Sequence, residues 1–275
     1  MRSLGLVDEW PVDNVATAVV GRDGQVLGSR GDQGRLFPLA SVTKLLTSYA
    51  VLIAVEEGAV ELDEPAGPEG STIRHLLAHA SGLAMSEDKI QAKPGTKRIY
   101  SNTGFDALAE AVQQASGIPF NAYLAEAVFA PLSMNDSTLK GSPAHAGVST
   151  CADLSRFAAE LLEPALVSRQ LFQEATTVVF PGLNGVLPGF GHQKPNDWGL
   201  GFSLRDHKSP HWTGRRNSPE TFGHFGQSGT FLWADPHAGI ATVALTDRAF
   251  GEWAAEAWPV FSDAVLEETS SAAGA

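Results

Sequence analysis

A serine and a lysine three residues apart stand before the longest apolar run of the chain. Ser41 is followed by Lys44, and apolar residues then recur at helical spacing through residues 45–55. On a helix that begins near Ser41, the lysine lies one turn further along the same face, so its amine can reach the serine oxygen. The positive end of the helix dipole favours negative charge on that oxygen, and burial lowers the pKa of a lysine. Ser41 and Lys44 are therefore candidates for a nucleophile and its proton acceptor.

The spacing alone does not decide this, because the same Ser-x-x-Lys pattern occurs twice more. Residues 86–89 and 137–140 carry it in polar or turn-rich sequence, where neither rigidity nor burial is expected. Taken alone, Ser41 and Lys44 fit equally well an N-cap serine beside a solvated lysine.

Two further segments carry groups suited to acyl transfer. Tyr100 and Asn102 stand directly before a predicted helix. A phenol beside an amine can shuttle protons, and an amide can orient Lys44 or a substrate carbonyl, although an N-cap is the plain structural role of Asn102. The glycine-rich segment that contains His224, Gly226 and Gln227 leads into an apolar strand. Such a strand edge lets substrate approach the backbone, whose N–H groups can stabilise an oxyanion.

The elements that must position these residues are extended runs at both chain ends and helices between them. Strands are predicted at 15–20, 25–28, 199–204, 230–234 and 240–246, and helices at 41–57, 71–79, 102–116, 120–128, 150–162 and 252–267. Residues 181–195 are rich in Gly and Pro and predict a long surface loop, and 269–275 predict a frayed tail. The pattern predicts a mixed α/β (α+β) fold, with one antiparallel sheet formed by both ends and flanked by helices. We assign residues 1–36 and 185–275 to the sheet region and 37–184 to an inserted, mainly helical region.

Composition excludes several classes of function. The 275 residues are 43% hydrophobic, which is enough for a large core, and the formal net charge of −12 opposes binding to nucleic acid or an anionic membrane. The single cysteine, Cys151, allows no internal disulfide and is expected to be a small buried residue. The first residues lack a secretory pattern and the apolar run 45–55 is too short to cross a bilayer, so a cytoplasmic location is expected.

Ser-x-x-Lys, Tyr-x-Asn and His-x-Gly, in that order, resemble the serine β-lactamase and penicillin-binding superfamily. The likeness is to its class C branch, with the family VIII carboxylesterases and D-alanyl-D-alanine carboxypeptidases, and the flanking text at 72–82, 94–96, 100–104 and 129–134 supports it. The resemblance implies that Ser41 is the acylated nucleophile, that Lys44 and Tyr100 transfer protons, and that Asn102 is an orienting amide. It also implies an oxyanion hole formed by the backbone N–H groups of Ser41 and Gln227. It implies no metal or organic cofactor. Which of Lys44 and Tyr100 is the base stays open.

One position departs from the family pattern. His224 stands where these enzymes usually carry lysine, and an imidazole that is mostly neutral at pH 7 holds a substrate carboxylate weakly. We therefore expect a serine hydrolase that forms an acyl-enzyme on a small ester or amide, with an ester, amide or β-lactam as its partner. The alternatives are a D-alanyl-D-alanine carboxypeptidase or true β-lactamase, and a non-catalytic ligand-binding or sensor homologue. In the acyl site, Trp198, Trp212 and Trp233 are candidate wall residues, with Trp212 nearest the entrance, whereas His79 is expected to be a hydrogen-bonded structural residue.

Overall fold

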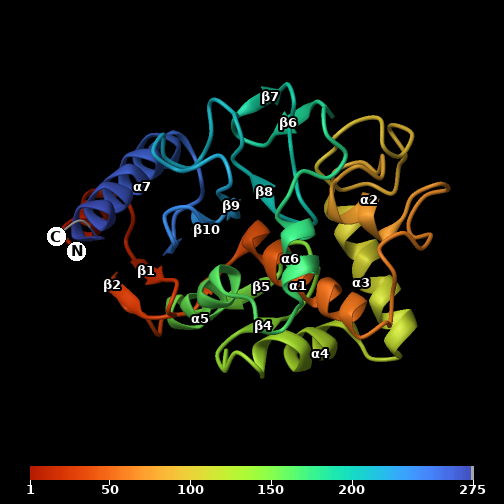
Figure 1. Ribbon diagram of the computed structural model, residues 1–275, viewed down its shortest axis with the longest axis horizontal. Helices are drawn as coiled ribbons and strands as arrows, with labels where there is room; N and C mark the ends of the chain where they lie inside the picture. Colours follow the sequence, from red (N-terminus) through yellow and green to blue (C-terminus); the bar gives the residue numbers. More distant parts are fainter. Residues whose placement is uncertain (274–275) are drawn as a thin grey trace.

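A six-stranded antiparallel sheet joins the two ends of the chain (Figure 1). The computed structural model describes residues 1–273, and the strand order is β2-β1-β11-β10-β9-β8. The bounds are Val15–Gly21 for β1, Val26–Arg30 for β2, Ser203–Leu204 for β8, Phe222–Gly226 for β9, Thr230–Asp235 for β10 and Ile240–Thr246 for β11. Because β1 pairs with β11 along its whole length, the first and last parts of the chain form the middle of the sheet. The predicted mixed fold, with a sheet built from both ends, is confirmed.

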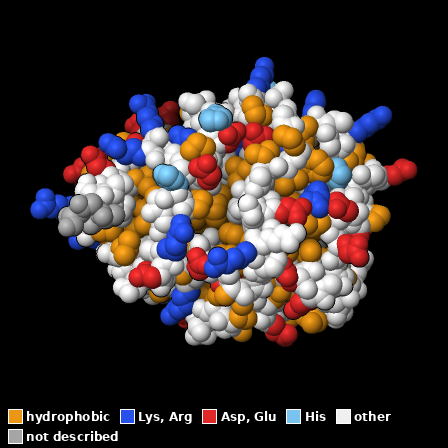
Figure 2. All heavy atoms as spheres, viewed as in Figure 1, with side chains coloured by type: hydrophobic (Ala, Val, Ile, Leu, Met, Phe, Trp, Pro, Cys, Tyr) orange, Lys and Arg blue, Asp and Glu red, His pale blue; other side chains and the backbone are white. Residues whose placement is uncertain are grey.

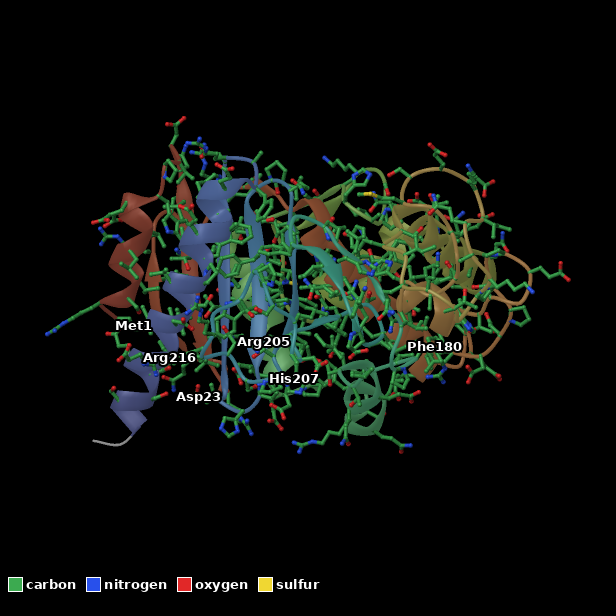
Figure 3. The ribbon with its side chains drawn as sticks, turned by 90° about the horizontal axis from the view of Figure 1, so that it is seen from above. Met1, Asp23, Phe180, Arg205, His207 and Arg216 are labelled. Atoms are coloured by element: carbon green, nitrogen blue, oxygen red, sulfur yellow. The ribbon has the colours of Figure 1, made fainter. Side chains whose placement is uncertain are left out.

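Helices cover both faces of this sheet and form a separate group beside it (Figure 1). One face carries α5, Cys151–Leu162, and the other carries α7, Glu252–Ala273, which also contacts the 3-10 helix η1, Ser3–Glu9. The group beside the sheet contains α1, Thr43–Glu56, α2, Ile73–Leu77, α3, Asn102–Ser116, α4, Phe120–Leu124, the π-helical turn η3, Ala125–Phe129, and α6, Arg169–Ala175. Figure 3 shows the same division from above, with Met1 and Arg216 on the side of α7 and Phe180 on the side of the helical group.

Small strands connect the helical group to the sheet. The three-stranded sheet β3-β5-β4 consists of Phe37–Pro38, Gly147–Ser149 and Thr138–Leu139, and β6, Gly185–Leu187, pairs with β7, Gly191–Gln193. The short 3-10 helix η2, Ala40–Val42, lies between β3 and α1.

The core has two parts, one on each side of the large sheet. Alternation along β10 divides them: Phe231 and Trp233 pack with α7, while Leu232 and Ala234 face the helical group. On that second side, every residue of α1 from Thr43 to Ala54 is buried, so the helix has no solvent-exposed stripe there. Within residues 1–273, no helix is both long and apolar enough to cross a membrane.

Several predicted boundaries are wrong, each because a local contact or distant pairing decides the structure. The predicted helix at 71–79 starts after Thr72, whose Oγ1 accepts a hydrogen bond from the backbone N–H of His75, and it ends at Leu77. The predicted loop 181–195 contains the β6–β7 hairpin, and only the last two residues of the predicted strand 199–204 are in β8. Helix α7 continues through the predicted tail as far as Ala273, and residues 274–275 lie outside the described part of the chain.

Candidate active site

Ser41 lies in a tight turn rather than at the start of the long helix. It is the central residue of η2, and α1 begins two residues later at Thr43. The residue before it, Ala40, has a φ of 44°, a left-handed conformation that residues other than glycine rarely adopt. Such strain persists only where surrounding structure enforces it, and it is concentrated at functional sites.

The hairpin between β9 and β10 supplies that enforcement. Ser228 donates from Oγ to the carbonyl of Pro38 at 2.7 Å, and Thr230 donates from Oγ1 to the carbonyl of Leu39 at 2.9 Å. Gly226 allows the close approach, because a Cβ at this position would lie 2.3 Å from the Leu39 carbonyl oxygen. The glycine of the His-x-Gly motif therefore brings the end of β9 against the turn that carries Ser41.

Lys44 is completely buried one turn beyond Ser41. Its Nζ lies 3.5 Å from Ser41 Oγ and donates to Asn102 Oδ1 at 2.6 Å and to the Ala144 carbonyl at 3.0 Å. Burial lowers the pKa of Lys44 from 10.5 to about 7, although the Asp106 carboxylate acts in the opposite direction. At neutral pH a large fraction of this amine is therefore unprotonated and able to accept a proton.

Tyr100 places its hydroxyl on the other side of the serine oxygen. Its Oη donates to Ser41 Oγ at 2.8 Å, and burial raises its pKa well above the usual value, so the group is a neutral phenol. The ring packs on the His79 imidazole with centroids 4.6 Å apart. Nδ1 of His79 accepts a hydrogen bond from the Ser101 backbone N–H at 3.1 Å, which confirms the predicted structural role of this histidine.

His224 faces the same phenol from β9. Its Nε2 lies 3.4 Å from Tyr100 Oη, and its Nδ1 donates to the Phe225 carbonyl at 2.6 Å, which assigns the hydrogen to Nδ1. Burial, assisted by the charge of Lys44, lowers the pKa of His224 to about 3. The imidazole is therefore neutral at physiological pH, and an unshared pair on Nε2 faces the Tyr100 hydroxyl.

Asn102 is the first residue of α3, and its side chain does not cap that helix. Ser101 is the N-cap, since its Oγ accepts a hydrogen bond from the Gly104 backbone N–H at 2.9 Å. The Asn102 amide is thus left to Lys44 through Oδ1 and to Ser86 Oγ through Nδ2 at 3.4 Å. The structural alternative for Asn102 is wrong.

Ser41 opens into a narrow pocket of about 40 Å³, which we call the acyl pocket. Its walls are mainly aromatic and aliphatic, and Gln227 lines it together with Ser41. The apolar lining residues are Met85, Leu187, Pro188, Trp198, Trp212 and Phe225. Figure 2 shows hydrophobic side chains around a hollow near the middle of this face. Two of the three candidate tryptophans line the pocket, but Trp212 is buried in the wall rather than at an entrance, and Trp233 packs in the core with Nε1 donating to Ser262.

Every residue that the three motifs nominated therefore meets at one place: Ser41, Lys44, Tyr100, Asn102, His224, Gly226 and Gln227. Sequence reasoning missed the Ala144 carbonyl that binds Lys44, because a main-chain acceptor 100 residues away leaves no mark in the side-chain pattern. It also missed the hairpin residues Leu187 and Pro188, which it placed in a surface loop.

Comparison with known proteins finds a family model and a solved structure that match most of the chain. A family model described as Beta-lactamase matches residues 13–265. The crystal structure of a beta-lactamase from Mycobacterium bovis is 58% identical and has a TM-score of 0.96, covering 97% of this chain and 99% of its own.

More distant relatives match in part or in fold alone. The D-alanyl-D-alanine-carboxypeptidase/endopeptidase AmpH of Escherichia coli K12 is 30% identical in an alignment 142 residues long, which covers 38% of this chain and 37% of that protein. The chain thus spans little more than a third of the length of this curated relative. EstCE1, a hydrolase with promiscuous acyltransferase activity, is 18% identical with a TM-score of 0.79, covering 96% of this chain and 97% of its own, and it shares the fold.

Proposed function

The chain belongs to the beta-lactamase family, and from this premise we propose that it is a serine hydrolase that forms an acyl-enzyme on small esters or amides. The observation that carries the proposal is the surrounding of Ser41 Oγ. A buried amine with a pKa of about 7 lies 3.5 Å away, and a neutral phenol donates to the same oxygen at 2.8 Å. A structural serine needs neither group, whereas a nucleophile needs both a proton acceptor and a path for the proton.

We assign the base role to Lys44 rather than to Tyr100. The pKa of Tyr100 is raised by burial, so its phenolate is disfavoured, while Lys44 is substantially unprotonated near pH 7. In the proposed first step, Ser41 Oγ attacks the carbonyl carbon as its proton passes to Lys44. The oxyanion is stabilised by the backbone N–H groups of Ser41 and Gln227.

The leaving group then departs with a proton that reaches it from Lys44 through the Tyr100 hydroxyl. The acyl group stays on Ser41 as an ester. In the second step a water molecule gives a proton to Lys44 and attacks the carbonyl carbon of that ester. The bond from this carbon to Ser41 Oγ then breaks, the acid is released, and Lys44 returns the proton to Oγ, which restores the serine hydroxyl. No metal or organic cofactor takes part in this proposed sequence.

A direct test uses p-nitrophenyl acetate and butyrate with the native protein and Ser41→Ala. We expect release of p-nitrophenol by the native protein and at least about a thousandfold less by the variant, in line with the loss of other serine nucleophiles. Intact mass after exposure to the ester should show one added acyl group, and digestion should place it on Ser41. Equal rates for the two proteins would remove Ser41 from the mechanism.

The second candidate function is that of a true β-lactamase or D-alanyl-D-alanine carboxypeptidase of class C type. The 58% identity to the Mycobacterium bovis beta-lactamase and the partial match to AmpH favour it. The neutral His224 opposes it, because substrates of these enzymes present a carboxylate near that position. Nitrocefin turnover and D-alanine release discriminate the two, and failure of both assays would dismiss this candidate.

A non-catalytic binder is the remaining alternative. It would leave the buried amine of Lys44 and the phenol of Tyr100 without a purpose. A fluorophosphonate probe that failed to label the folded native protein would favour the binder. The cytoplasmic location also stays a prediction, which fractionation of expressing cells would test.

A further inference from the structure

A second and much larger cavity opens beside the catalytic tyrosine. It has a volume of about 790 Å³ and shares Met85, Tyr100 and Pro188 with the acyl pocket. Apart from residues 85, 99 and 100, its lining comes from two segments, 89–98 and 181–194. We call this cavity the lysine groove, after Lys97 and Lys194, the two exposed cations on its walls.

The charge of the groove is opposite to that of the chain. The two segments hold none of the 31 acidic residues and five of the 19 Lys and Arg residues, in a protein of net charge −12. Within residues 1–273, no carboxylate lines the groove, although Glu87 and Asp88 immediately precede the first segment. A concave surface lined by one sign of charge concentrates ligands of the other sign.

Arg98 holds the two segments in a fixed relation. It is buried, and its guanidinium donates to four main-chain carbonyls at 2.5–3.0 Å, those of Ala78, Val179, Phe180 and Asn196. Figure 3 labels Phe180 on the side of the helical group. Arg98 also forms a parallel bridge with Gly185, where a Cβ would lie 2.2 Å from the Arg98 carbonyl oxygen. The bridge between Arg98 and Gly185 therefore joins the two segments next to Lys97, and the guanidinium holds the chain on both sides of the second segment.

The sizes of the two cavities decide which part of a substrate each can hold. The acyl pocket, with about 40 Å³, is far smaller than the lysine groove, with about 790 Å³, so only the smaller part of an ester fits into the pocket. Any larger part of an ester must lie outside it. The lysine groove is the adjoining space, and it shares Tyr100, the residue that we propose to protonate the leaving oxygen.

We propose that the natural substrate is a short-chain acyl ester whose leaving alcohol carries an anionic group, bound in the lysine groove by Lys97 and Lys194. This inference rests on the proposed hydrolase function and names the substrate class of the same site. The lysines of the groove bind the negative charge of the substrate, and the neutral His224 does not contribute to this binding.

The test compares two acetyl esters that differ in one charge: 4-acetoxybenzoate and its neutral methyl ester. Each kcat/KM is divided by the rate of hydroxide hydrolysis of the same ester, and the anion-to-neutral ratio is the readout. We expect Lys97→Glu/Lys194→Glu to lower this ratio about tenfold at low ionic strength, because two attractive charges become repulsive. Raising the salt from 0.01 M to 1 M should reduce the native preference, since the screening length falls from about 30 Å to about 3 Å.

The matched control is Arg22→Glu/Arg169→Glu, which makes the same change in net charge at exposed positions outside the groove. The inference is overturned if the ratio is the same in both double variants. Calorimetric binding of 4-hydroxybenzoate to Ser41→Ala, with and without the two groove substitutions, answers the same question without catalysis. If Ser41→Ala hydrolyses esters as fast as the native protein, the proposed function fails, and this binding comparison still supports or overturns the anion site.

Discussion

Replacement of Asn102 by aspartate tests whether Lys44 is the base, because it places a negative charge on the atom that now accepts from the amine. The Lys44 Nζ and Asn102 Oδ1 atoms are 2.6 Å apart, and the substitution preserves the shape of the side chain. With an effective dielectric constant of about 20, Coulomb's law gives about 6 kcal/mol for two unit charges at this distance. Desolvation of the new carboxylate consumes most of that energy, and one nearby opposite charge commonly shifts a pKa by about 1 to 3 units.

A rise of about 2 units would move the Lys44 pKa from about 7 to about 9. The neutral fraction at pH 7 would then fall from about one half to about one per cent, and kcat/KM at pH 7 should fall about 50-fold. Because deprotonation of the lysine restores the base, kcat/KM should recover as the pH rises through 9. The assay is the pH profile of p-nitrophenyl acetate hydrolysis between pH 5 and 10, after subtraction of the rate of Ser41→Ala.

Two further variants separate charge from the loss of the amide. Asn102→Leu removes the acceptor without adding charge, so the pH at which kcat/KM reaches half of its maximum on the acidic side should lie at or below 7. Asn121→Asp makes the same charge change at an exposed position of α4, and its profile should match that of the native protein. If Asn102→Asp loses activity equally at every pH and its half-maximal pH on the acidic side stays near 7, the assignment of Lys44 as the base is wrong.

Three other predictions concern His224, acid stability and the Arg98 clamp. His224→Lys should raise kcat/KM for nitrocefin about tenfold relative to p-nitrophenyl acetate, because it restores a cation beside the bound carboxylate; an unchanged ratio of the two rates contradicts this. In the folded protein the pKa values of His79, His211 and His224 lie below the unfolded value of about 6.5. As the pH is lowered through 6.5, the unfolded chain therefore takes up protons before the folded protein does, and the free energy of unfolding decreases. Urea unfolding should show a loss of up to about 4 kcal/mol per pH unit from the three groups together, and a free energy of unfolding that is constant from pH 7 to 5 would exclude it. Arg98→Met should destabilise the fold by about 3 to 5 kcal/mol, because it leaves buried carbonyls without their hydrogen-bond donor. The measurement is thermal unfolding, and a loss of stability below about 1 kcal/mol would show that other groups bind these carbonyls.

The sequence predicted best those elements whose structure depends on the apolar pattern of residues close to one another along the chain. The apolar runs of β10 and α1 are local patterns; β10 lies where it was expected, and α1 begins two residues after the predicted start at 41. The β6–β7 hairpin was missed because its Gly- and Pro-rich composition is typical of loops, while its pairing depends on contact between its own two arms and with Arg98. Pairing partners of this kind are not encoded in the composition of one segment.

The site divides in the same way. Order and spacing of the three motifs nominated Ser41, Lys44 and Tyr100, but their approach depends on Gly226 fitting against residue 39 and on a left-handed backbone at Ala40. Neither feature has a signature in the residue types alone, since glycines are common in loops and alanine rarely adopts that conformation. The resemblance to a known family supplied the expectation that these motifs meet, and physical reasoning from the residues could not have supplied it.

The exchange of lysine for histidine at position 224 bears on both proton transfer and substrate recognition. A cation at this point would face the Tyr100 hydroxyl and lie near Lys44, and it would lower the pKa of both groups. With a neutral imidazole there, Tyr100 keeps a raised pKa, and burial alone brings Lys44 to about 7. The same neutrality removes the usual partner of a substrate carboxylate. If the substrate is anionic, the charge that binds it must therefore come from another surface, and the lysine groove beside Tyr100 is a cationic surface that adjoins the reacting atoms.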